Sequence, residues 1–208
     1  MSQMAVVNFD ILIRSMFLQA SFIIFMFLSS DINDNILANN QIFLQFHSQS
    51  AYALDGFAFS AEALIGQAFG AKSLASIRKV SIFSTFWALL ASIILTLCFY
   101  FGSDFLIALM TTSESLRETS KIYVHWVIMA PMLAAPAFIL DGIFIGATRT
   151  KDMRNCMIIS FCIYCLVIWL FYEPFGNQGL WASLMVMFIV RAITLFVRYF
   201  NIERVIDS

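Results

Sequence analysis

The stretch Ala130–Asn155, APMLAAPAFILDGIFIGATRTKDMRN, decides the fold. It places two prolines, Pro131 and Pro136, in an apolar run that also carries Asp141. Each proline removes one helical hydrogen bond and bends the helix, which membrane helices tolerate because neighbouring groups satisfy the freed carbonyls. A carboxylate this deep in apolar sequence is costly unless it faces a polar cavity or a partner. The stretch therefore predicts a membrane helix with an acid at a candidate site beside a helix break.

Two pairs of glycines suggest where helices pack closely. Gly142 and Gly146 follow the acid at a spacing of four residues, and Gly66 and Gly70 repeat that spacing earlier in the chain. Residues four apart lie on one face of a helix, and glycines there let another backbone approach. We expect both pairs to be packing sites.

The composition excludes a soluble domain. Of the 208 residues, 61% are hydrophobic and 12% are charged, and the mean hydropathy is +0.86. Soluble domains are usually about 45–50% apolar and about 25% charged. The sequence therefore predicts an integral membrane protein in contact with the lipid bilayer. A net charge of −1 without a basic patch gives no reason to expect a nucleic-acid partner.

Six apolar segments predict a single all-α polytopic domain over residues 1–208, because each is long enough to cross a hydrocarbon core about 30 Å thick. The segments are about 9–30, 36–70, 79–103, 119–148, 154–173 and 179–200. An even number places both termini on one side. Basic residues on that side are Arg14, Lys72, Arg78, Lys79, Arg149, Lys151, Arg154, Arg198 and Arg204; the opposite side has only Arg117 and Lys121. This bias predicts that both termini are cytoplasmic.

The second segment is too polar to meet lipid on all sides, so it must line an interior. Its polar residues are Asn39, Asn40, Gln41, Gln45, His47, Gln49, Asp55, Glu62 and Gln67. Asp55 and Glu62 are seven residues apart and share one helix face. We take Asp55, Glu62 and Gln67 as candidates for binding a substrate or an ion.

Asp141 and Arg191 are the other candidates, and each has two interpretations. Asp141 either binds a cation, a proton or a cationic substrate, or is a buried acid paired with a basic or amide group on the second or sixth segment. Arg191 lies near the middle of the sixth segment. It either pairs with a buried acid, which we expect, or extends its guanidinium to the cytoplasmic interface.

Two motifs resemble a known family. Residues 55–67, DGFAFSAEALIGQ, and residues 141–155, DGIFIGATRTKDMRN, resemble the second and fourth helices in the C-terminal half of multidrug and toxic compound extrusion (MATE) transporters of the DinF-like branch. The resemblance implies a carrier of two six-helix lobes, of which this chain matches one. It implies that the partner is the missing N-terminal lobe or a second copy of the chain, with the cavity between the two lobes.

The resemblance also implies an activity. We expect multidrug efflux by antiport against protons or sodium, with small cationic organic substrates, in the bacterial cytoplasmic (inner) membrane. The alternatives are a truncated fragment that does not transport, or a lipid flippase of the same superfamily. We do not expect an enzyme, a metal site or a cofactor, because the sequence shows neither a nucleophile with a base nor a metal pair near one face.

Overall fold

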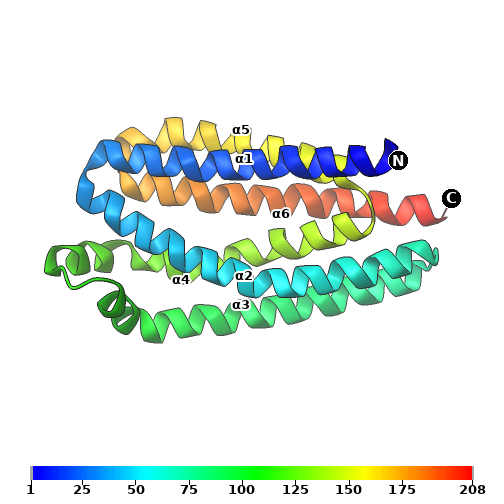
Figure 1. Ribbon diagram of the computed structural model, residues 1–208, viewed down its shortest axis with the longest axis horizontal. Helices are drawn as coiled ribbons and strands as arrows, with labels where there is room; N and C mark the ends of the chain where they lie inside the picture. The colour runs from blue at the N-terminus through cyan, green and yellow to red at the C-terminus, as the bar shows by residue number, and fades with distance from the viewer. Residues whose placement is uncertain (1, 208) are drawn as a thin grey trace.

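The chain folds into six long helices. The structure is a computed structural model and describes residues 2–207. The helices are α1 (Ser2–Ile32), α2 (Asp34–Gly70), α3 (Leu74–Met110), α4 (Glu114–Gly146), α5 (Thr150–Phe175) and α6 (Asn177–Asp207). They run side by side along one axis, so that the start of α1 and the end of α6 lie at the same end of the bundle (Figure 1). This arrangement confirms the predicted all-α class.

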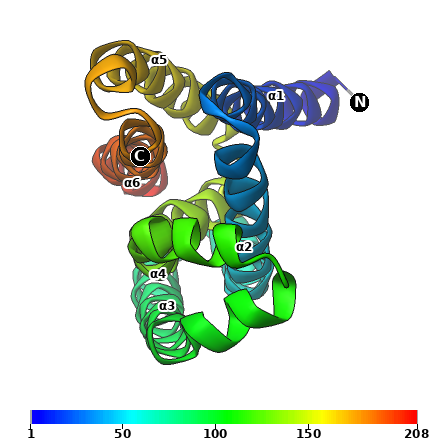
Figure 2. The ribbon, with the colours of Figure 1, turned by 90° about the vertical axis from the view of Figure 1, so that its left-hand side faces the viewer.

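Viewed along the axis, the helices form an elongated bundle with α1 and α5 at one side and α3 at the other (Figure 2). Helices α2 and α4 lie between them and are in extensive contact with each other. Since α4 also packs against α3 and α6, it is the helix that most of the bundle surrounds. Its buried residues are concentrated between Ala130 and Phe144, within the stretch on which the sequence analysis began.

The helices are longer than the apolar segments that predicted them. Helix α1 covers 31 residues and α3 covers 37, whereas the predicted segments were 9–30 and 79–103. Apolar runs mark the part of a helix that meets lipid, whereas α1 and α3 continue beyond that part at both ends. Helix α4 stays helical through Pro131 and Pro136, so neither proline interrupts it.

Five of the helices in the described range, all except α2, are long and apolar enough to cross a membrane. Helix α2 does not meet this criterion because it carries many polar residues. These residues lie on two faces of the helix. Asn39, Asn40 and His47 are buried, which confirms that α2 lines an interior. Gln41, Gln45 and Gln49 are exposed on the opposite face.

The turns at the end of the bundle that carries the termini share one design. Helices α2 and α4 both end in a glycine followed by an alanine, and the next residue has a left-handed backbone, with φ of 51° at Lys72 and 54° at Thr148. After α4, the amide of Arg149 donates to the carbonyl of Phe144 at 2.9 Å, the long bond that closes a Schellman motif. Glycine is the usual residue at this position because a Cβ there is unfavourable.

Replacing Thr148 with glycine is therefore expected to stabilise the chain by about 1 kcal/mol, since threonine is β-branched and exposed at this left-handed position. The measurement is the thermal unfolding midpoint of the purified chain in detergent. Thr119→Gly is the control, because Thr119 is half-buried and lies inside α4, where glycine costs about 1 kcal/mol. An unchanged or lower midpoint for Thr148→Gly would show that the threonine is not strained.

Candidate functional site

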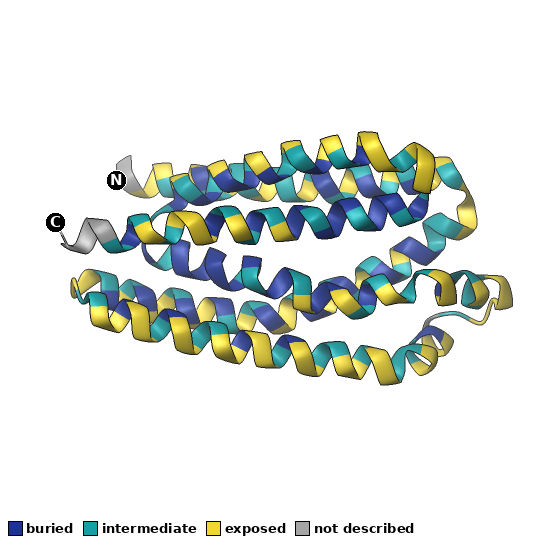
Figure 3. Cartoon of the chain, turned by 180° about the vertical axis from the view of Figure 1, so that it is seen from behind, coloured by how far each residue is buried: buried dark blue, intermediate teal, exposed yellow. Residues whose placement is uncertain are grey.

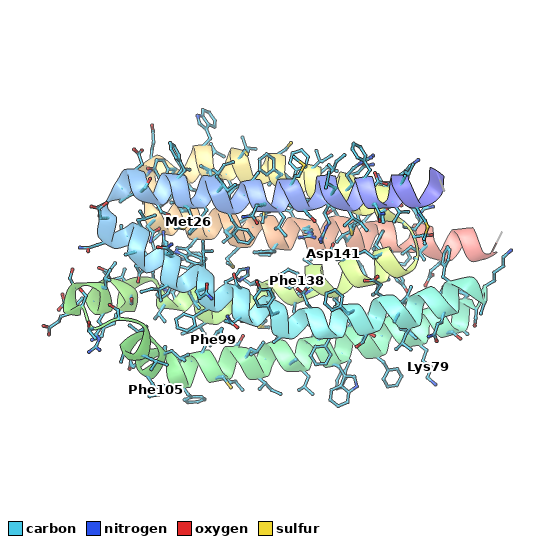
Figure 4. All side chains as sticks on the ribbon, in the orientation of Figure 1. Met26, Lys79, Phe99, Phe105, Phe138 and Asp141 are labelled. Atoms are coloured by element: carbon cyan, nitrogen blue, oxygen red, sulfur yellow. The ribbon has the colours of Figure 1, made fainter. Side chains whose placement is uncertain are left out.

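A cluster of three charged residues from three helices lies inside the bundle. Asp141 of α4 is buried, and its Oδ2 accepts a hydrogen bond from Arg14 of α1 at 2.7 Å. The same oxygen accepts from Nη2 of Arg191 on α6, whose side chain is completely buried. In Figure 4, Asp141 lies among α1, α4 and α6. We call these three residues the charge cluster.

The charge cluster confirms that Arg191 pairs with a buried acid rather than extending to the interface. The sequence analysis expected a partner for Asp141 on either the second or the sixth segment. The structure shows this partner on α6, and none on α2 among the described residues. A second partner, Arg14, was not expected. The sequence analysis counts Arg14 only among the basic residues on the side of the termini, whereas its side chain is just 18% exposed and bonded to Asp141.

The charge cluster is not fully satisfied by hydrogen bonds. Its formal charge is +1, because two guanidinium groups share one carboxylate. Among the described residues, the buried atoms Oδ1 of Asp141, Nε of Arg14, and Nε and Nη1 of Arg191 have no hydrogen-bond partner. Buried polar groups without partners are rare in proteins and are often functional. The pairing of Asp141 with a basic group on α6 matches the structural interpretation of this acid; a role of Asp141 and Arg191 in binding stays a prediction from the sequence.

Asp55 lies beside the charge cluster on α2. It is half-buried, and its charge interacts with those of Asp141, Arg14 and Arg191. Within the described part of the chain, however, no ion pair forms at Asp55. The fold therefore brings together three of the predicted candidates from α2, α4 and α6, and leaves Asp55 as the acid that is not bound by a basic group.

The other two candidates on α2 lie further toward the end of the bundle that carries the termini. Glu62 is half-buried and Gln67 is exposed. Neither has a side-chain hydrogen bond or ion pair to another described residue, so the structure does not place them in the charge cluster. A role for them in binding remains a prediction from the sequence.

The glycine pairs position the site by bringing α2 and α4 together. A Cβ at Gly142 would lie 2.2 Å from the carbonyl oxygen of Ala58, and a Cβ at Gly146 would lie 2.5 Å from that of Glu62. These contacts confirm that the glycines on α4 are packing sites. On α2 the expectation holds in part: a Cβ at Gly66 would make an ordinary contact of 3.6 Å, whereas Gly70 has open space around it.

A second buried ion pair was missed by the sequence analysis. Asp10 of α1 is 1% exposed and accepts hydrogen bonds from Arg154 at 2.6 Å and from Thr150 at 3.1 Å. Asp10 and Arg14 are four residues apart, so both face the interior from the same side of α1. That spacing of two opposite charges in an otherwise apolar segment was the signal that could have indicated an interior face.

These features define a polytopic membrane protein with charged groups buried between its helices. The MatE family model matches residues 11–170, which is most of the chain. The chain therefore belongs to the MatE family of transporters, as its two motifs predicted. It is an integral membrane protein, and a curated relative from Escherichia coli agrees with the predicted location in the bacterial inner membrane.

The relatives are about twice as long as this chain. DNA damage-inducible protein F of Escherichia coli strain K12 is 31% identical over 188 residues, which are 90% of this chain and 41% of that protein. Two solved structures share the fold: a MATE protein in the bent conformation (TM-score 0.84, 15% identity) and the Vibrio cholerae MATE transporter VcmN in the bent form (TM-score 0.81, 17% identity). The matches cover 95% and 93% of this chain but 45% and 44% of those chains. The chain corresponds to one half-size lobe.

Proposed function

We propose that this chain is one lobe of an efflux carrier that exports small organic compounds by antiport against protons or sodium. The observation that carries the proposal is the exposed polar face of α2. Gln41, Gln45 and Gln49 are exposed at successive helical turns, in a helix that lies among five apolar ones. Exposed amides at membrane depth are unfavourable against lipid, so this face is suited to a water-filled path.

Asp55 is the acid best placed to act on that path. It follows Gln49 by less than two turns and lies at the edge of the same helix face, with its side chain half-buried. Asp141 is already bound by two arginines, whereas no basic group binds Asp55 in the part of the chain that the structure describes. We therefore assign attraction of a cationic substrate, or of the coupling ion, to Asp55.

The charge cluster has a different part in this proposal. It joins α1, α4 and α6 behind the polar face of α2, so that a change of charge at Asp55 acts on three helices at once. A second lobe is needed to close the path on its other side. The lengths of the relatives favour a further six-helix lobe, and a second copy of this chain is the alternative.

Replacing Asp55 with asparagine in the complete transporter is expected to reduce efflux of a cationic dye such as ethidium at least tenfold. The reason is that asparagine keeps the size of the side chain but removes its charge. The measurement is dye efflux from drug-sensitive cells, with the amount of transporter in the membrane determined in parallel.

Asp104→Asn is the matched control, because Asp104 is exposed near the far end of α3. Efflux by Asp55→Asn at the wild-type rate, with equal protein in the membrane, would contradict the assignment. In inverted vesicles, an imposed proton gradient and an imposed sodium gradient distinguish the two coupling ions.

A further inference from the structure

A groove lies on the side of the bundle opposite to α1, where α3 and α6 diverge over α4. It has a volume of about 640 Å³ and is lined almost entirely by apolar side chains. Seen from behind, buried residues of α4 lie between α3 and α6 (Figure 3). The main lining residues are Ile82, Phe86, Leu140, Ile143, Ala192 and Phe196.

Two polar bridges join α3 to α6 at one end of the groove. Tyr199 donates a hydrogen bond to Ser81 at 3.1 Å. One turn further toward the termini, the guanidinium of Arg78 donates to both carboxylate oxygens of Glu203, at 2.9 and 2.8 Å. The groove is therefore closed at the end predicted to be cytoplasmic and open along its side.

The length of the groove fits one membrane leaflet. On α3 the lining runs from Ser81 to Leu89, eight residues further along, which corresponds to about 12 Å at a rise of about 1.5 Å per residue. Half of a hydrocarbon core about 30 Å thick is about 15 Å. A helix that spans the whole core would run into the two bridges, whereas a single acyl chain of the predicted cytoplasmic leaflet ends before them.

The closed end carries a surplus of positive charge. Arg78 and Lys79 of α3 lie at this end with one acid, Glu203 of α6, whereas Arg198 lies on another face of α6 and pairs with Asp152 of α5. Lys79 is exposed and projects from α3 away from the bundle (Figure 4). A basic group between membrane helices on the cytoplasmic side attracts anionic headgroups, by about 1 kcal/mol for each Lys or Arg near the membrane surface.

We propose that this groove binds one anionic phospholipid, with its phosphate at Arg78 and Lys79 and one acyl chain between α3 and α6. The apolar lining takes up the chain, and the basic end selects the headgroup. The proposal is independent of the transport mechanism, because the groove lies on the other side of α4 from Arg14 and α1.

The test is native mass spectrometry of the purified chain, released from detergent that contains equal amounts of phosphatidylglycerol and phosphatidylcholine. One bound phosphatidylglycerol is expected on the wild-type chain. Ala192→Trp fills the groove and is expected to remove it, and Lys79→Glu is expected to weaken it at least fivefold. Thr85→Trp fills the groove from α3 and gives a second, independent variant.

Matched controls separate these effects from general damage. Ala63→Trp adds the same bulk at an exposed position of α2, and Lys121→Glu reverses an exposed charge at the other end of the bundle. Both are expected to keep the lipid, and circular dichroism verifies that each variant is helical. Equal retention of the two lipids, or retention of phosphatidylglycerol by both groove-filling variants, would overturn the proposal.

Discussion

Replacing Asp141 with asparagine is expected to lower the free energy of unfolding by about 3–5 kcal/mol. The Oδ2 atom of the buried carboxylate binds both Arg14 and Arg191. Asparagine retains the shape of the side chain but removes its charge, so two guanidinium groups would face each other in a poorly hydrated interior. Breaking a buried ion pair is costly because it leaves a charge without compensation.

The thermal unfolding midpoint and the yield of folded chain in detergent measure this effect. Arg191→Leu is expected to cause a smaller loss, because Asp141 keeps Arg14 as its partner. The combined variant Arg14→Met, Asp141→Leu and Arg191→Met is expected to recover much of the stability, since it removes the buried charges together. A midpoint for Asp141→Asn equal to that of the wild type would mean that the charge cluster does not stabilise the bundle.

Replacing Gly142 with alanine is expected to destabilise the chain by about 1–3 kcal/mol, although alanine favours a helix by about 1 kcal/mol over glycine. The added Cβ would lie 2.2 Å from the carbonyl oxygen of Ala58. Because that atom belongs to the backbone of α2, it cannot move aside as a flexible side chain can. The two helices must separate, and the contacts that align Asp55 with Asp141 are lost with them.

Gly70→Ala is the matched control, because no atom lies within 4 Å of a Cβ at that position. It should leave the unfolding midpoint unchanged or raise it. Gly146→Ala should resemble Gly142→Ala, since its Cβ would lie 2.5 Å from the carbonyl oxygen of Glu62. Equal midpoints for Gly142→Ala and Gly70→Ala would contradict the close approach of α2 and α4.

The residues that the sequence predicted best are those whose type is unusual for their surroundings. An acid and an arginine inside apolar segments need a partner or water, and Asp141 and Arg191 form an ion pair with each other. Glycines four apart on α4 indicated a close approach, and Gly142 and Gly146 contact the backbone of α2. In each case few other environments suit that type of residue, so the sequence alone could indicate the contact.

Residues near the ends of the predicted apolar segments were predicted less well. Arg14 and Arg154 were assigned to the basic flanks of the membrane, but both reach inward to buried acids. A long basic side chain near the end of an apolar segment can extend to water or bend toward a partner, and the sequence around it is compatible with both. Glu62 and Gln67 also have long side chains that can point to water or to a partner, and they do not take part in the charge cluster.

The sequence by itself determined the class of this protein: a lobe of membrane helices with an acid and an arginine inside and a close helix contact at Gly142. Apolar length and buried charge are properties of each segment and need no knowledge of its neighbours. Only the tertiary structure decided that Arg14 shares Asp141 with Arg191 and that Asp10 binds Arg154. These pairings depend on the rotation and depth of each helix relative to the others, and α1, which is apolar on most sides, carries little information on either.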